Sequence, residues 1–213
     1  MAGAGTGLHL PDLASAGIVS RRTEGPEFGF IHGLTRHAIY SSLLPSHRTE
    51  LHGRVAAVLE GRLPIDVGRL AFHYDLAADD RKAVEYLVAA AEEAMDAYTN
   101  PAARHHLERA LEHASRLDPA DQAHWKGRIL LHIGEILERD AQHETARATL
   151  AQALDLLGQD PLEQARALLL IGRTHRLEES LDQAHAFYTQ AEESLDRLPQ
   201  RDSPEAHRLW IEI

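Results

Sequence analysis

The stretch GEILERDAQHETARATLAQA, residues 134–153, decides the fold. Its first residue, Gly134, is followed 12, 16 and 19 residues later by Ala146, Leu150 and Ala153. These offsets place the last three residues on one face of a helix, while Gly134 belongs to a preceding helix. The stretch therefore predicts a helical hairpin in which a small residue faces the second helix.

The same spacing occurs in two further places. The three sets begin 43 and 38 residues apart, which is the period of a helical repeat. Hairpins of this size cannot bury their apolar faces alone and must stack on one another. The sequence therefore predicts an all-α stack of hairpins, an architecture that more often binds than catalyses. The other two sets are Ala91/Ala103/Leu107/Ala110 and Gly172/Ala184/Tyr188/Ala191.

Caps and prolines predict where the helices begin. A capping side chain precedes a proline at Asn100, Asp118, Asp160 and Ser203, and Glu163 completes a capping-box pattern with Asp160. The helix from Pro204 carries Leu209, Trp210 and Ile213 without a polar cap, so we expect a fragment or a covering partner. The predicted repeat helices are 80–98, 101–117, 119–140, 143–158, 161–178 and 180–197.

The region before the repeats has a different pattern of apolar and polar residues. Residues 18–22 and 27–32 alternate like two short strands around Gly25-Pro26, and 34–44, 47–59 and 66–77 have helical periodicity. We predict three regions, at 1–33, 34–79 and 80–213. They are a segment with a β-hairpin, connecting helices, and repeats at 80–117, 119–158 and 161–197 with a partial repeat from 203.

Composition excludes several function classes. The chain has no cysteine, so it offers no disulfide and no thiolate site. It shows neither a leader nor an apolar run of membrane-spanning length, so we expect no membrane partner and a cytoplasmic protein. The net charge is −11, and residues 1–60 carry five acidic and five basic side chains, so all of the excess lies on the repeats. That sign argues against direct nucleic-acid binding.

The repeats resemble tetratricopeptide repeats. Ile133-Gly134 and Ile171-Gly172, with the Ala, large residue and Ala that follow each, match that pattern. Leu130 and Leu168 replace the usual tryptophan of the first helix, and the proline that often closes such repeats is missing, so these are degenerate copies.

Residues 10–117 carry a second resemblance, to bacterial signal-transduction ATPases of the STAND class. It rests on Phe28-x-Phe30-x-His32-x-Leu34, Leu51-His52, Leu59-Glu60, His73-Tyr74 and Lys82-Ala83-x-x-Tyr86. In that class a P-loop ATPase is followed by a winged helix and a repeat array, often linked to a nucleotide cyclase or a LuxR-type transcription domain. The resemblance implies that residues 10–32 are the tail of a winged helix. One candidate partner is then an ATPase domain of the same full-length protein.

The sequence offers no standard catalytic motif. It lacks G-x-x-x-x-G-K-[ST], so we expect no ATP binding by the route of that class and no cofactor. It also lacks G-x-S-x-G, S-x-x-K and H-E-x-x-H. No histidine pair has chelating helical spacing, and His132/Glu135 is a common chance combination, so we interpret the 15 histidines as structural or solvated and predict no metal site. Arg21-Arg22 on the hairpin could touch DNA phosphates, but we favour a structural role.

The remaining candidate site is the concave groove formed by the first helix of each repeat. We expect its charge to run from acidic to basic along the repeats, which would orient an extended peptide or a neighbouring domain. The alternative is a solvated helix face. The charged residues predicted to line the groove are Glu85, Glu92, Asp96, Arg128, Glu135, Glu138, Arg139, Arg166, Arg173 and Arg176, and the apolar ones are Val88, Met95, Leu131, Leu169 and Leu177.

Three functions remain open. The leading hypothesis is a non-catalytic scaffold or sensor module of a bacterial signal-transduction or transcription regulator, which binds protein, peptide or a small effector. The second is a free-standing adaptor of the tetratricopeptide type. The third is a metal-dependent hydrolase that uses the histidines.

Overall fold

The structure is a computed structural model, and it describes residues 10–21, 28–158, 160–198 and 204–212. Its contacts divide the chain into two units, Met1–Leu51 and His52–Ile213, which are described separately. The boundary falls within one helix, α3 (Pro45–Glu60).

The first unit contains the predicted β-hairpin. Helix α1 (Leu10–Ser15) precedes β1 (Val19–Arg21), which pairs antiparallel with β2 (Phe28–Phe30) so that Val19 lies opposite Phe30. Helix α2 (Gly33–Ser42) follows. The two strands are confirmed, while the Gly25-Pro26 turn and Arg22 lie outside the described residues.

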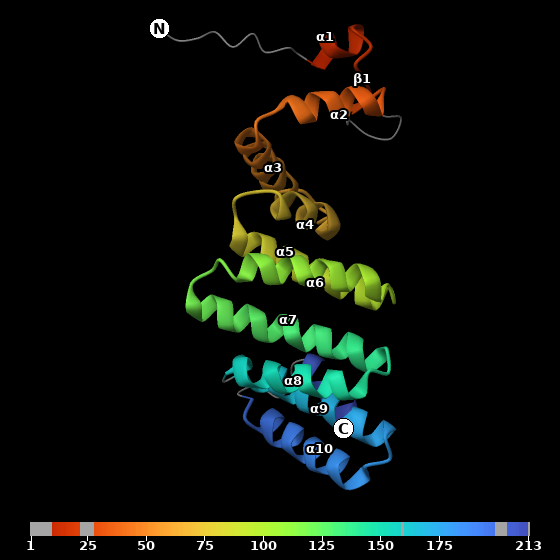
Figure 1. The fold of residues 1–213 in the computed structure, drawn as a ribbon, viewed down its shortest axis with the longest axis vertical. Helices are drawn as coiled ribbons and strands as arrows, with labels where there is room; N and C mark the ends of the chain where they lie inside the picture. The colour runs from red at the N-terminus through yellow and green to blue at the C-terminus, as the bar shows by residue number, and fades with distance from the viewer. Residues whose placement is uncertain (1–9, 22–27, 159, 199–203, 213) are drawn as a thin grey trace. The chain divides into compact units, whose positions relative to one another are not determined.

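The second unit is an all-α stack of sequential antiparallel helix pairs, which confirms the predicted fold class (Figure 1). Each helix of a pair packs most extensively on its partner, and α6 and α8 then pack on the next pair. After α4 (Val67–Asp75), the three pairs are α5 (Asp80–Asp96) with α6 (Asn100–Ala114), α7 (Pro119–Arg139) with α8 (His143–Leu157), and α9 (Pro161–Leu177) with α10 (Leu181–Asp196).

The spacing that predicts the hairpins has a steric cause. A Cβ atom added at Gly134 would lie 2.5 Å from Cγ of Leu150, and one added at Gly172 would lie 2.5 Å from Cε1 of Tyr188. Carbon atoms in contact stay near 3.5–4.0 Å apart, so neither position accepts a side chain in this packing. In these two pairs the small residue is therefore what allows the helices to approach.

A common turn joins the two helices of each pair. Tyr98, Ala141 and Glu179 have φ values of 56°, 57° and 61°, and they are 43 and 38 residues apart, like the repeats themselves. In the middle repeat Ala141 N–H donates to Glu138 O and Gln142 N–H donates to Leu137 O, and the other two turns repeat both bonds. This is the Schellman arrangement that satisfies the last carbonyl groups of a helix. None of the three positions is glycine.

The predicted caps have mixed outcomes. The side chains of Asp118 and Asp160 accept hydrogen bonds from backbone N–H groups of the first helical turn, as expected. The prediction for Asn100 is wrong, because Thr99 is the N-cap residue and the Asn100 amide donates to Asp140 instead, at 2.8 Å. Ser203 and Ile213 lie outside the described residues.

The last helix, α11 (Pro204–Glu212), departs from the alternation of the pairs. It packs chiefly against α9, beside which it is drawn in dark blue in Figure 1. Ala206 is fully buried in a cluster with Ala165 and Leu195, and Leu209 is partly buried against the same cluster. Helix α11 therefore packs beside α9, and both helices line the groove described below.

Four of the motif residues that carry the second resemblance meet at the junction of α3, α4 and α5. Glu60 accepts hydrogen bonds from the hydroxyl groups of Tyr74, at 2.9 Å, and Tyr86, at 2.8 Å, and from the ammonium group of Lys82. The rings of Tyr74 and Tyr86 stack with their centroids 5.2 Å apart. This carboxylate therefore joins three helices, which gives this part of the motif a structural explanation.

We expect Glu60→Gln to lower the free energy of unfolding at pH 7 by about 1.5–3 kcal/mol, because a neutral amide cannot serve three donors. The hydrogen bonds from Lys82 and Tyr86 hold the pKa of Glu60 below its ordinary value of 4.5. The stabilisation is therefore complete above pH 4.5 and is lost as the pH falls through the lowered pKa. Urea unfolding between pH 7 and pH 3 measures it.

Glu85→Gln is the matched control for this substitution, because Glu85 is an exposed carboxylate on α5. We expect it to change stability by less than about 0.5 kcal/mol at any pH. A difference between Glu60→Gln and the native chain that persists undiminished at pH 3 would contradict the assignment.

Candidate functional site

The candidate site is a groove of about 700 Å³ along the first helices of the repeats. Pockets of 300–1,000 Å³ are typical of ligand sites. Its charged side chains stand on α5, α7, α9 and α11, and its apolar ones are Met95, Leu162, Leu169, Leu170 and Leu209. The charged and polar lining residues are Glu92, Asp96, Arg128, His132, Glu135, Arg139, Glu163, Arg166, Arg173, Arg208 and Glu212.

The structure brings seven of the ten predicted charged residues together in this groove and leaves three outside it. Glu85 and Arg176 are exposed away from it, because their positions on α5 and α9 turn them to solvent. Glu138 is buried beneath it, where it pairs with Arg173 at 3.2 Å. The seven are Glu92, Asp96, Arg128, Glu135, Arg139, Arg166 and Arg173. Their role in partner binding stays a prediction.

The apolar predictions divide in the same way. Met95 and Leu169 line the groove. Val88 and Leu131 are buried between helices, and Leu177 is exposed at the end of α9. The sequence pattern assigns these residues to one helix face, but their burial in the stack differs from one helix to the next.

A repeated ion pair crosses the floor of the groove. Glu92 on α5 lies 3.6 Å from Arg128 on α7, and Glu135 on α7 lies 2.6 Å from Arg166 on α9. The two acids are 43 residues apart and the two arginines are 38 apart, which are the repeat spacings. The pairs are therefore equivalent positions of successive repeats, and each links one first helix to the next.

The two equivalent pairs differ in burial. The side chain of Glu135 is 13% exposed, against 43% for Glu92, and Glu135 also accepts a hydrogen bond from Arg139. Burial raises the pKa of Glu135, but the charges of Arg166 and Arg139 outweigh it and hold that pKa below its ordinary value. Glu135 is therefore a carboxylate fixed in its ionised form.

Glu92 has a second partner, His132. The imidazole is almost fully buried, and its Nε2 atom lies 3.1 Å from Glu92 Oε1. This hydrogen bond is the main reason that the pKa of Glu92 falls below its ordinary value. His132 thus pairs with Glu92 on a neighbouring helix and not with Glu135, which is three residues away on its own helix.

A third link reaches α11. Arg173 on α9 lies 3.2 Å from Glu138 and 3.8 Å from Glu212, the last residue of α11. Arg128 also lies 3.3 Å from Glu163, so α5, α7 and α9 are connected in series. The sequence predicts that the charge of the groove runs from acidic to basic. Helix α5 contributes only acidic residues, but α7 and α9 contribute both signs, and neighbouring charges largely neutralise one another.

Sequence reasoning missed several lining residues. Glu163 reads as part of a capping box, yet its carboxylate faces Arg128 while only its backbone N–H bonds Asp160. The residues on α11 could not be assigned, because nothing in the repeat pattern says that this helix lies against α9. The missed residues are His132, Leu162, Glu163, Leu170, Arg208, Leu209 and Glu212.

Histidines elsewhere make contacts that no local spacing could indicate. His52 and His73 lie with their Nδ1 atoms 2.9 Å apart, and burial lowers the pKa of both. His113 is buried between Asp80, at 2.6 Å, and Asp75, at 3.0 Å. Among the residues that the structure describes, no group of three or more histidine, aspartate or glutamate side chains could hold a metal ion.

Comparison with known proteins gives a distant relation. No protein-family model matches the chain, and neither does any solved structure. The chain is similar to "Uncharacterized protein R02095" of Rhizobium meliloti (strain 1021), at 30% identity over 161 residues. The match covers 71% of this chain and 16% of that protein, so the chain corresponds to a small part of its relative's length. Within the described ranges, no helix is long and apolar enough to cross a membrane.

Proposed function

We propose that this chain is a non-catalytic binding module, the scaffold or sensor part of a bacterial signal-transduction or transcription regulator. It binds a protein, a peptide or a small effector in the groove. The observation that carries the proposal is that three successive first helices present equivalent faces to one continuous groove. A surface built by repetition suits an extended partner that contacts several repeats at once.

The charges of the groove support binding over catalysis. A general acid or base works best with a pKa near the operating pH. The pKa values of Glu92 and Glu135 instead lie below their ordinary value, and both carboxylates are held by neighbouring cations. Side chains in this state orient a ligand but do not exchange protons with it at neutral pH.

The regulator assignment has two supports. The motifs at Glu60, Tyr74 and Lys82 resemble the STAND class, and the bacterial relative is much longer than the matched segment. A neighbouring ATPase domain of the same full-length protein is therefore one candidate partner.

Site-selective blocking tests the groove, because the chain has no cysteine of its own. Glu212→Cys places one thiol on the groove wall, and Gln152→Cys places one on the exposed surface of α8. Peptides are selected from a phage-displayed random library on the native chain, and their affinity is then measured by fluorescence anisotropy. We expect a bulky maleimide at Glu212→Cys to weaken binding at least about tenfold, and the same label at Gln152→Cys to leave it unchanged. Binding that survives the first label, or a library that yields no binder, would refute the proposal.

A further inference from the structure

Two charged residues of opposite sign in the groove take part in none of its ion pairs. Five arginines and five carboxylates line it, and eight of these ten groups are paired through the links described above. The two that remain are Asp96 and Arg208, and within the described part of the chain neither makes an ion pair or a side-chain hydrogen bond.

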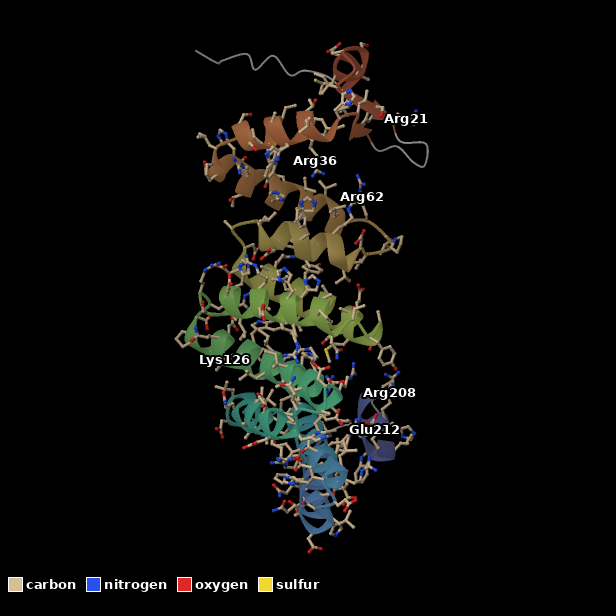
Figure 2. The ribbon with its side chains drawn as sticks, turned by 45° about the vertical axis from the view of Figure 1, so that its right-hand side comes forward. Arg21, Arg36, Arg62, Lys126, Arg208 and Glu212 are labelled. Carbon is tan, nitrogen blue, oxygen red and sulfur yellow. The ribbon has the colours of Figure 1, made fainter. Side chains whose placement is uncertain are left out.

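These two residues stand on the first and the last of the four lining helices. Asp96 is the last residue of α5. Arg208 lies in the middle of α11, where Figure 2 shows it near Glu212, and α11 packs against α9. A ligand that compensates both charges must therefore reach from the first repeat to the third.

The distance between these walls sets the size of the ligand. Packed helices lie about 8–10 Å apart, so the two steps from α5 through α7 to α9, the helix on which α11 packs, span about 16–20 Å. An extended peptide advances about 3.3 Å per residue, so five or six residues cover this span. The two charges of a single free amino acid are far too close together to meet both walls.

The floor between the walls sets the remaining chemistry. Leu162 and Leu209 are the partly exposed apolar residues of the lining, and Glu135 and Arg166 of the floor already pair with each other. Bringing another charge to this region would require breaking a pair that is largely buried, which is costly. The middle of the ligand is therefore uncharged.

We propose that the groove binds an extended peptide of about six residues with a basic side chain at one end, an acidic side chain at the other, and uncharged residues between them. The basic end pairs with Asp96 and the acidic end with Arg208. This inference rests on the proposed function and adds the class of ligand to it.

Three fluorescent hexapeptides with blocked termini test the inference. They share an interior of alternating leucine and serine and differ in their end residues, which are Arg and Glu, Arg and Arg, or Glu and Glu. For the native chain we expect the mixed peptide to bind about fivefold more tightly than either of the others, as exposed ion pairs allow. Arg208→Asp should then favour the Arg/Arg peptide, and Asp96→Arg the Glu/Glu peptide.

Both substitutions are at exposed positions, so circular dichroism should show an unchanged fold. Lys126→Asp, exposed on α7 and outside the groove, is the matched control and should keep the native order of affinities (Figure 2). The same order of affinities in all variants, or no binding of any of the three peptides, would overturn the inference. The proposed function would still stand in that case if library-selected peptides bind the native chain and the label at Glu212→Cys weakens their binding.

Discussion

Replacing Leu150 with alanine is expected to lower the free energy of unfolding by about 3–5 kcal/mol. Leu150 is fully buried in a cluster with Leu131, Ile171 and Leu157, where α8 meets α7 and α9. Alanine would leave a cavity at the contact between the middle and third repeats. Because each repeat is held only by its neighbours, a loss at this contact weakens the whole stack. Urea unfolding followed by circular dichroism measures the effect.

A second substitution shows whether the close approach of the helices causes this sensitivity. Gly134→Ala alone should cost about 1–3 kcal/mol, because its Cβ atom would overlap the side chain of Leu150. In the Leu150→Ala background the same Cβ enters vacated space, and the helix gains about 0.8–1 kcal/mol from losing a glycine. We therefore expect the double variant to be more stable than Leu150→Ala alone.

Gly68→Ala provides the control for helix propensity. Gly68 is an exposed helical glycine on α4, and the nearest atom to an added Cβ is Asp66 Oδ1 at an ordinary 3.9 Å. We expect alanine there to be neutral or to stabilise by up to about 1 kcal/mol. Strictly additive effects of Gly134→Ala and Leu150→Ala would show that the two side chains do not compete for the same space.

The pattern around Gly134 also explains how much of the fold could be predicted. Small residues at fixed distances report a contact between adjacent helices, and such contacts are local in sequence, so every predicted repeat helix is found within a few residues of its expected bounds. The groove was predictable for the same reason, because one helix face repeats from α5 to α9. The wrong prediction for Asn100 shows the limit, since its amide donates a hydrogen bond to Asp140 of the next repeat and does not cap its own helix.

The features that the sequence did not predict depend on contacts across many residues. Glu60 and Tyr86 are joined across 26 positions, and His52 and His73 across 21. In both cases the two residues lie on different helices, so the periodicity of one helix could not reveal the contact. Helix α11 is a further case, because its amphipathic pattern fits packing on either helix of the last pair. In each case, which side chains meet is decided by the angle between helices, and the sequence alone does not state it.

Replacing Glu135 with leucine is expected to destabilise the protein by about 3–4 kcal/mol, the second largest effect that we predict. Its carboxylate is largely buried and is shared by Arg139 and Arg166, so its removal leaves Arg166 without its closest partner. The double variant Glu135→Leu with Arg166→Met should recover most of that loss, because apolar residues can replace a buried ion pair at little net cost. Thermal and urea unfolding of the native chain, the single variant and the double variant measure both effects.

The equivalent pair of the previous repeat provides the comparison. Glu92→Leu removes a carboxylate at the same repeat position, but its side chain is 43% exposed and lies 3.6 Å from Arg128. We expect a loss of only about 1–2 kcal/mol, because Arg128 keeps its second partner Glu163, at 3.3 Å, and the main cost is the buried Nε2 atom of His132 that loses Glu92. A loss at Glu92 equal to that at Glu135 would mean that burial does not set the strength of these links. If the expected difference is found, the floor is rigid near α9 and adaptable near α5, so a ligand would reorganise the groove first at the wall that carries Asp96.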